Sequence, residues 1–223
     1  MQLSKGTLAI IKNFSGINNS IILNSGNKIA SMAAGRSVLA EAVVEETFPQ
    51  DFAIYDLNEF LAVQSLFENP ELDFHPKYVT ISEGKNSIKY FAADISNIKP
   101  ASSIKEFPAA EVNFTLSQSL LKQILSASSV IGVADFSVIG DGESMIISIG
   151  DKTNPTSSSF NSVVGVTDKT FKVNFKVENL KLIPGDYDVS ISSKKISRFK
   201  AHSVNLVYYI AIEADSTFDF VTE

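Results

Sequence analysis

The sequence predicts an α+β fold built as two similar domains, each with two helices packed on an antiparallel sheet. Amphipathic helical patterns begin near residue 3 and again near residue 116. Short alternating apolar runs, separated by Gly, Asn and Ser, follow each of them, which is typical of antiparallel strand meanders. The order helix, meander, strand, helix, meander thus occurs twice, and a chain of 223 residues accommodates two domains of about 110 residues.

The first domain is predicted to span residues 1–98 and to open with a helix from Leu3 to Phe14. The apolar stripe of this helix consists of Leu3, Thr7, Ile10, Ile11 and Phe14. Lys5 and Lys12 fall within roughly 20° of each other on the opposite side. Because surface helices commonly carry lysines on their solvated side, the pair indicates either an ordinary wet face or a binding face.

The rest of the first domain reads as strands around a second helix. Strands are predicted at residues 21–23, 28–32, 38–44, 52–55, 78–81 and 87–92. The second helix is predicted from Leu57 to Phe67, with Asp56 as its N-cap and no lysine on its wet side. Residues 99–110 contain two prolines, two serines and no helical or strand period, so they are predicted to connect the two domains.

The second domain, residues 111–223, repeats the pattern. A strand at 111–115 precedes a helix from Leu116 to Ser128, with Lys122 on the side away from its apolar stripe. That stripe consists of Leu116, Leu120, Ile124 and Ile131. Further strands are predicted at residues 136–139, 145–149, 160–166, 171–175, 186–192, 196–200 and 204–212, with a serine-rich loop at 154–159. A short helix is predicted over 176–183, before Pro184-Gly185.

The charge pattern is uneven. Net charge is −6, which argues against tight nucleic-acid binding by the molecule as a whole. The lysines on the predicted helices are Lys5, Lys12, Lys122, Lys176 and Lys181. Acidic residues concentrate at 41–51, 68–73, 135–151 and from 213 onward. Lysines gathered on one face can hold a polyanion loosely in spite of a negative total charge.

A second basic group, SSKKISRFK at residues 192–200, is most simply interpreted as an exposed hairpin that its charges keep soluble.

Little in the sequence supports catalysis, a metal or a cofactor. There is no cysteine, and the two histidines, His75 and His202, have no second histidine nearby in the sequence. No phosphate-binding GxxxxGK[ST] motif and no GxSxG motif occurs. The amino terminus has no apolar leader, and no apolar stretch approaches the length of a membrane span, so a soluble intracellular protein is expected.

Several strings resemble one known family. They are LSKGTLAIIKNFSGIN (3–18), IILNSG (21–26), FAIYDLNEFLAVQSL (52–66), Phe107-Pro108 of the connector, LIPGDYDV (182–189) and EADSTFDF (213–220). Together they closely resemble the DNA sliding clamps of T-even-type bacteriophages, the processivity factors of the phage DNA polymerase. The resemblance runs from end to end and is weakest over residues 134–170, which form one side of the expected subunit interface.

This resemblance implies a DNA clamp fold assembled as a homotrimeric ring around duplex DNA, whose phosphates face Lys5, Lys12, Lys122, Lys176 and Lys181. It implies no enzymatic activity and no cofactor. The implied partners are duplex DNA bound without sequence preference, the replicative DNA polymerase, an ATP-driven clamp loader and late-transcription factors, in the cytoplasm of the infected bacterial host.

Two further surfaces are expected from the resemblance. A pocket for partner peptides is expected at Ile104, Phe107, Pro108, Tyr208 and Ile210, for which ordinary core packing is the alternative. The subunit interface, edge strand to edge strand, is expected at Tyr90, Phe91, Phe160, Val163 and Val164.

Two other functions remain open at this stage. A non-catalytic β-rich structural or assembly protein of a virus would also suit an acidic, phenylalanine-rich chain. An enzyme that uses carboxylates alone has only paired acids such as Asp186 and Asp188 to support it, and such pairs are far more often surface residues.

Overall fold

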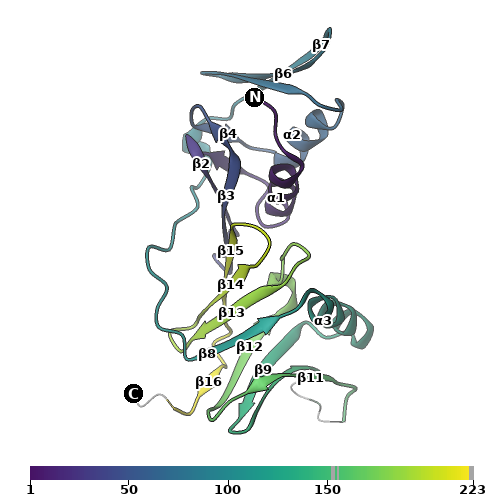
Figure 1. The fold of residues 1–223 in the computed structure, drawn as a ribbon, viewed down its shortest axis with the longest axis vertical. Helices are drawn as coiled ribbons and strands as arrows, with labels where there is room; N and C mark the ends of the chain where they lie inside the picture. Colours follow the sequence, from purple (N-terminus) through teal and green to yellow (C-terminus); the bar gives the residue numbers. More distant parts are fainter. Residues whose placement is uncertain (152–153, 155, 221–223) are drawn as a thin grey trace. The chain divides into compact units, whose positions relative to one another are not determined.

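Two compact units make up the chain, Met1–Ile104 and Lys105–Glu223. The computed structural model describes residues 1–151, 154 and 156–220, so one residue of the predicted serine-rich loop, 155, lies outside the described residues. Each unit combines helix with antiparallel sheet (Figure 1). In the described part of the chain, no helix is long and apolar enough to cross a bilayer.

The first unit begins with a helix and ends with a three-stranded meander. Its elements are α1 (Lys5–Ser15), β1 (Ile21–Leu23), β2 (Gly26–Met32), β3 (Val38–Phe48), β4 (Phe52–Ile54), α2 (Leu57–Gln64), β5 (Glu71–His75), β6 (Tyr78–Glu83), β7 (Asn86–Phe91) and the 3₁₀ turn η1 (Ile95–Asn97). β1 pairs with β4, β2 with β3, and β6 lies between β5 and β7, all antiparallel.

The second unit has two sheets and one long helix. Its elements are β8 (Val112–Leu116), α3 (Gln118–Ile131), β9 (Asp135–Asp141), β10 (Ser144–Ile149), β11 (Phe160–Val166), β12 (Thr170–Lys176), the 3₁₀ turn η2 (Val177–Asn179), β13 (Tyr187–Ser192), β14 (Ile196–Ala201), β15 (Leu206–Ala211) and β16 (Thr217–Phe218). One sheet has the order β11-β10-β9-β12-β16, and in the other β8, β13, β14 and β15 pair in that order.

The two units share a pairing scheme. The antiparallel pairs β1–β4 and β2–β3 of the first unit recur in the second as β9–β12 and β10–β11. A three-stranded meander follows in each, β5-β6-β7 and β13-β14-β15. The α+β class predicted from the sequence is therefore confirmed, and the predicted repeat is present except that the second helix of the second unit is reduced to η2.

Aromatic side chains fill both cores. In the first unit the ring of Phe74 packs edge-on against Phe48 and Phe52, at 6.1 and 5.3 Å between centroids. In the second unit Phe136 stacks on Phe175 at 4.9 Å. Edge-to-face and offset-stacked rings add to the stability from buried area, so these pairs help to fix how the strands of each unit pack against one another.

Several element predictions were wrong in extent, and β3, for example, ends at Phe48 rather than at residue 44. α2 ends at Gln64 rather than Phe67, and α3 continues to Ile131 rather than stopping at Ser128. The short helix predicted over 176–183 is only the turn η2, whose N-cap residue makes no side-chain capping bond. A segment this short before Pro184-Gly185 cannot recover the cost of nucleating an α-helix. β5 was not predicted at all.

Candidate nucleic-acid interface and partner surfaces

α1 presents two lysines to solvent because its other side is fixed in the core. Ser4 is the N-cap, and its hydroxyl accepts a hydrogen bond from the Thr7 N–H at 3.2 Å. The buried residues of the helix are Thr7, Ile10, Ile11 and Phe14, as the apolar stripe predicts, whereas Leu3 before the helix is half-buried. Lys5 and Lys12 are both exposed. Their ammonium groups are thus available to a polyanion.

A groove of about 820 Å³ separates α1 from α2. Lys5 and Lys12 lie along it, with Leu8 and Leu61 among the apolar residues that line it. Asn58 contributes a polar group from α2, which carries no lysine. The positive charge of this surface therefore comes from α1 alone.

α3 carries the corresponding lysine in the second unit. Its N-cap Ser117 accepts from the Leu120 N–H at 3.2 Å, and Gly132 ends the helix in the left-handed conformation, with φ of 77°. Leu120 and Ile124 of the predicted stripe are buried, Ile131 is half-buried, and Lys122 is exposed.

Lys176 and Lys181 are placed differently from the expectation. Lys176 is the last residue of β12, and its ammonium lies 2.7 Å from the Asp135 carboxylate. This hydrogen bond raises the pKa of Lys176. Lys181 follows η2 and is half-buried. Neither residue lies on an α-helix, and the charge of Lys176 is already balanced by a carboxylate.

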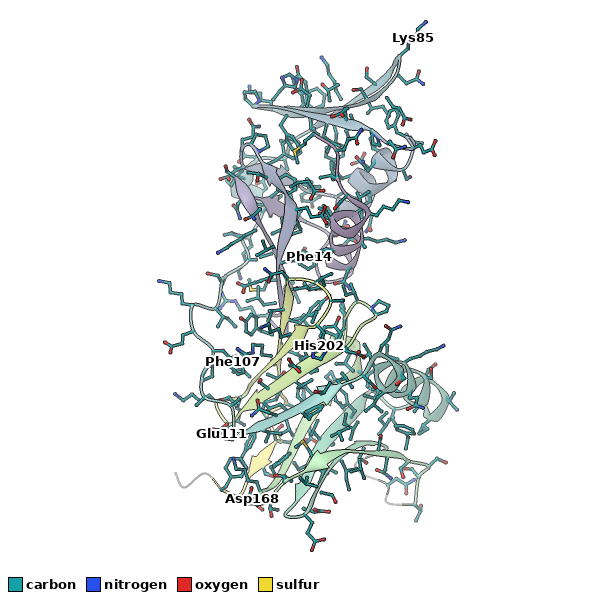
Figure 2. The ribbon with its side chains drawn as sticks, in the orientation of Figure 1. Phe14, Lys85, Phe107, Glu111, Asp168 and His202 are labelled. Atoms are coloured by element: carbon teal, nitrogen blue, oxygen red, sulfur yellow. The ribbon has the colours of Figure 1, made fainter. Side chains whose placement is uncertain are left out.

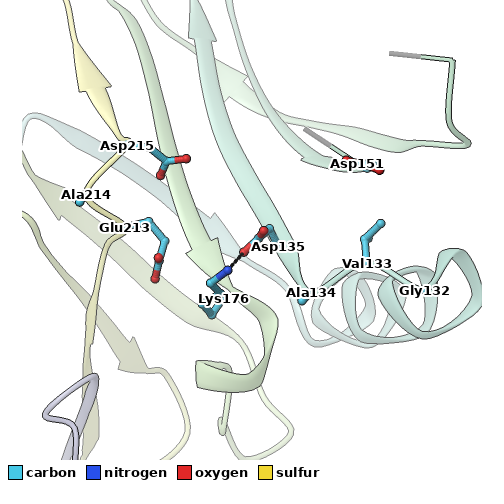
Figure 3. Close-up of a pocket in the computed structure, with 10 residues that line it drawn as sticks. Gly132, Val133, Ala134, Asp135, Asp151, Lys176, Glu213, Ala214 and Asp215 are labelled. Atoms are coloured by element: carbon cyan, nitrogen blue, oxygen red, sulfur yellow. Dashed lines mark ion pairs between the residues drawn. The ribbon is translucent and has the colours of Figure 1, made fainter. Parts of the chain in front are cut away.

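Lys176 belongs to an acidic pocket of about 550 Å³ (Figure 3). The carboxylates that line it are Asp135, Asp151, Glu213 and Asp215. Their negative charge makes this pocket a poor place for a DNA phosphate.

The expected peptide pocket needs a correction at β15. Tyr208 and Ile210 are 0% exposed, so both are core residues and the prediction chose the wrong face of the strand. The Tyr208 hydroxyl accepts from the Ile183 N–H at 3.2 Å, and burial raises the pKa of Tyr208. Since side chains alternate along a strand, the face away from the core carries Val207 and Tyr209 instead.

Phe107 of the connector lies against that outer face (Figure 2). Its ring is 6.1 Å from the ring of Tyr209, and the guanidinium of Arg198 lies 4.8 Å above it. Pro108, next to it, is half-buried. Ile104, the last residue of the first unit, is half-buried as well. The accessible apolar surface here therefore centres on Phe107 and Tyr209.

Tyr90 and Phe91, the two residues of β7 expected at the subunit interface, lie on opposite faces of the strand. Tyr90 is 9% exposed, packs edge-on against Phe60 at 5.4 Å and donates its hydroxyl to the Asp56 carbonyl at 3.1 Å. Burial raises the pKa of Tyr90 to about 12. Tyr90 is therefore a core residue, whereas Phe91 is 68% exposed on an edge strand of its sheet.

β11 is likewise an edge strand and carries apolar side chains in solvent. Val163 is 67% exposed, and Phe160 and Val164 are half-buried. The pairing of β11 with β10 shifts register, because Met145 lies opposite Gly165 and Ile146 opposite Val163. Val164 is the extra residue of this bulge. Exposed apolar groups on two unpaired edges are the usual mark of strand-to-strand contact between chains.

Two carboxylates that contact the lysine-bearing helices were not predicted. Glu46 accepts hydrogen bonds from the Ser4 N–H and the Thr7 hydroxyl at the start of α1. Asp186 accepts from the Gln118 N–H at 2.7 Å at the start of α3. Both partners are distant in sequence, so no local pattern could have indicated the pairs.

Family models match both halves of the chain. One described as "DNA polymerase processivity factor" matches residues 4–100, and one described as "gp45 sliding clamp, C terminal" matches residues 113–214.

Similar curated proteins match over nearly their whole length, and each is called "Sliding clamp". That of Vibrio phage KVP40 is 34% identical over 222 residues, covering 96% of this chain and 100% of the relative. Those of Escherichia phage RB69 and Enterobacteria phage T4 are 31% and 30% identical, each covering 99% of this chain and 100% of the relative.

Solved structures of proteins from cellular organisms share the fold of this chain. Proliferating cellular nuclear antigen (PCNA) from Entamoeba histolytica superposes with a TM-score of 0.67 at 14% identity, covering 92% of this chain and 94% of that one. A. fulgidus PCNA, solved with the C-terminal region of FEN-1 bound, gives 0.70 at 13% identity, with 94% and 96% covered. At such low sequence identity these superpositions establish only the fold of the chain, and they confirm the predicted clamp fold.

Proposed function

Because this chain belongs to the family of bacteriophage sliding clamps, the DNA polymerase processivity factors, we propose that three copies of it form a closed ring around duplex DNA. The ring tethers the replicative DNA polymerase and is opened and closed by a separate ATP-driven clamp loader. The family consists of scaffolds without catalytic activity, so we assign no reaction to the chain itself. The alternative of a viral structural or assembly protein has no counterpart in these matches.

The observation that carries this proposal is the exposure of Lys5, Lys12 and Lys122 on helices whose other sides are buried. Contacts from mobile ammonium groups to phosphates do not depend on base sequence and weaken with salt. Such contacts allow a ring to move along DNA. Lys176 and Lys181 remain part of the proposed lining, where we expect Lys176 to contribute less because Asp135 neutralises it.

The closed shape of the ring then provides the long residence on DNA that weak contacts alone cannot provide. A closed ring stays on DNA by linkage, and a polymerase bound to it is held at high effective concentration near the primer end. We propose that β7 of one subunit, through Phe91, meets β11 of the next, through Phe160, Val163 and Val164. Both strands are unpaired edges with exposed apolar side chains, which suits a head-to-tail contact.

We propose that partner peptides dock beside the connector, on the surface of Phe107, Pro108 and Tyr209 rather than on Tyr208 and Ile210. Ile104 stays within this proposal. The polymerase, the clamp loader and late-transcription factors are the proposed users of the surface, and the host cytoplasm is the proposed location.

Retention on circular DNA tests the ring. The chain has no cysteine, so single cysteines at Ser87 in β7 and Asn161 in β11 can be joined specifically by a flexible bis-maleimide. The cross-linked ring should remain on nicked circular DNA and be lost when the circle is linearised. Equal retention on both forms, or none on either, would contradict the proposal, as would a monomer in a solution mass measurement.

Charge reversal tests the lining. Lys5→Glu with Lys12→Glu should reduce DNA retention and processive synthesis while leaving the fold and the trimer intact, since both side chains point away from the core. The control is Lys77→Glu with Lys85→Glu, which changes the charge equally in the turns of the β5-β6-β7 sheet. Lys85 is labelled in Figure 2. A loss of folding in the first variant, or equal effects of both, would show that the helix face is assigned wrongly.

A further inference from the structure

Each α-helix in the described part of the chain begins against a carboxylate. At α1, Glu46 of β3 accepts from the Ser4 N–H and the Thr7 hydroxyl. At α2, the N-cap Asp56 accepts from the Glu59 N–H at 3.0 Å. At α3, Asp186 accepts from the Gln118 N–H at 2.7 Å.

For α1 and α3 these carboxylates are additional to an ordinary N-cap. Ser4 and Ser117 each already accept a hydrogen bond from an N–H of the first turn, at 3.2 Å in both helices. Glu46 and Asp186 are 42 and 68 residues away in sequence from the amides that they accept from. Two helices with complete serine caps thus each receive a negative charge from a distant segment.

The position of these charges matters because a helix N-terminus is a natural phosphate site. Its free N–H groups and the helix dipole both favour an anion. Lys5 is the first residue of α1, so a phosphate at this end could be held by fixed amides and an ammonium group together. Such a phosphate would be a stationary contact, unlike one made by a mobile lysine alone.

Glu46 is ionised at neutral pH. Burial by itself would raise the pKa of Glu46, but the hydrogen bonds from Thr7 and Ser4 outweigh burial and hold the pKa below its ordinary value of 4.5. A carboxylate already occupies the place that a phosphate would take, and it repels an approaching one.

We propose that Glu46 and Asp186 exclude DNA phosphates from the N-termini of α1 and α3, and so confine DNA contact at these two helices to the side chains of Lys5, Lys12 and Lys122. The inference rests on the proposed function, because it concerns the same lysine-bearing helices. It makes the two acids determinants of weak, mobile binding, and it predicts that removing their charge strengthens the hold on DNA.

The test uses Glu46→Gln and Asp186→Asn in the full chain. In Asp186→Asn the amide oxygen can still accept from the Gln118 N–H, so the main change is the lost charge. In Glu46→Gln the one amide oxygen can replace only one of the two carboxylate oxygens that accept from Ser4 and Thr7, so this variant loses a hydrogen bond together with the charge. Binding of a short fluorescent duplex with free ends is measured by anisotropy over a salt series. Each variant should bind about 2- to 5-fold more tightly than wild type at low salt, the range expected for an anion at a helix N-terminus.

The matched control is Glu45→Gln, which removes the same charge from the exposed neighbouring residue of β3. Tighter binding by Glu46→Gln and Asp186→Asn than by Glu45→Gln supports the inference, since structural damage alone would not increase affinity. Binding no tighter than that of the control overturns it. Thermal melting is measured alongside, and if Glu46→Gln does not fold, Asp186→Asn decides the outcome.

Lys5→Glu with Lys12→Glu separates this inference from the proposed function. If the lysine variant loses binding while the two acid variants behave like the control, only the exclusion of phosphates is wrong. If the lysine variant binds the duplex as wild type does, the proposed lining is wrong and the inference falls with it.

Discussion

A buried polar network around Asn174 connects β12 to the segment at 213–220. The Asn174 amide oxygen accepts from the Ser137 hydroxyl at 2.6 Å, and its backbone N–H donates to the Ser216 hydroxyl at 3.0 Å. Its side-chain amide donates to the Asp215 carbonyl at 3.3 Å. Asn174 is 2% exposed, so each of these bonds replaces lost water contacts. The Ser216 hydroxyl therefore attaches this segment to β12.

Asn174→Ala should lower the free energy of unfolding by about 1–3 kcal/mol, because it leaves the buried Ser137 hydroxyl without the amide oxygen to which it donates. Urea denaturation measures the change. Asn113→Ala, at an exposed position in the middle of β8, is the matched control and should change stability little. Equal losses in the two variants would mean that the network contributes nothing specific.

The contact between Glu46 and α1 gives stability a defined pH dependence. The folded-state pKa of Glu46 lies below its ordinary value of 4.5, so the folded chain binds fewer protons than the unfolded chain in that range. The contribution is therefore fully present above pH 4.5 and is lost as pH falls below it. Urea midpoints should show Glu46→Gln less stable than wild type at neutral pH, with the difference shrinking on acidification. A constant difference would contradict this account.

At the scale of elements, glycines mark both the turns and one crowded point inside a sheet. Gly84 and Gly142 adopt positive φ, of 60° and 90°, in the turns of the β6–β7 and β9–β10 hairpins. Gly140 is different, because it lies within β9 opposite Phe171 of β12. A Cβ at Gly140 would come within 2.4 Å of the Phe171 ring and 2.6 Å of the Lys169 carbonyl oxygen.

Gly140→Ala should therefore destabilise the second unit by about 1–3 kcal/mol, since the backbone oxygen cannot move aside without disturbing the pairing of β9 with β12. Gly165→Ala in β11 of the same sheet is the control. A Cβ there meets only the Met145 methyl group, at an ordinary 3.8 Å. Thermal melts should show a clear loss for the first variant and little change for the second, and similar melts would refute the crowding.

An element could be predicted from the sequence when the residues that determine it are adjacent in the chain. α1, α3 and the glycine-containing hairpins have their apolar periods and turn residues in adjacent positions, so the sequence predicted that these elements exist. η2 was overestimated because its apolar pattern resembled a helix too short to nucleate. β15 was located correctly, but both of its faces are apolar, so only the three-dimensional packing distinguishes buried Tyr208 from accessible Tyr209.

Contacts between distant segments could not be predicted from the sequence. The acidic stretch at 41–51 was expected to lie away from the lysines, yet Glu46 within it reaches the first turn of α1. Similarly, Asp186 was considered only as one of a pair of surface acids. In both cases the partner is a backbone N–H, which leaves no trace in residue type.

At the scale of the whole molecule, the repeat produces two different unpaired edges. β7 is an edge strand of a sheet in the first unit, and β11 is an edge strand of a sheet in the second. One chain therefore carries both of the strands that a contact between neighbouring subunits needs. A contact between unlike surfaces is head-to-tail and can continue from subunit to subunit until a ring closes. The apolar groups at stake are Phe91 on one edge and Val163 on the other, exposed by 68% and 67%.

Phe91→Asp and Val163→Asp should each abolish the trimer, because each places a charge in an apolar strand contact at every interface of the ring. Phe91→Asp alters only β7, and Val163→Asp alters only β11. In a mixture, the unaltered β7 of Val163→Asp can therefore still pair with the unaltered β11 of Phe91→Asp. The mixture should therefore form a one-to-one dimer that cannot grow or close, detectable by solution mass measurement.

Leu66→Asp is the control for this experiment and should remain trimeric, because Leu66 is 69% exposed, follows the C-cap of α2 and lies on neither edge strand. If β7 paired with β7, or β11 with β11, the variant whose pairing strand is unaltered would still associate with itself. Mixing the two variants would then produce no new species. A dimer that appears only on mixing thus distinguishes a head-to-tail ring from a symmetric pair, and its absence would remove β7 and β11 as the interface.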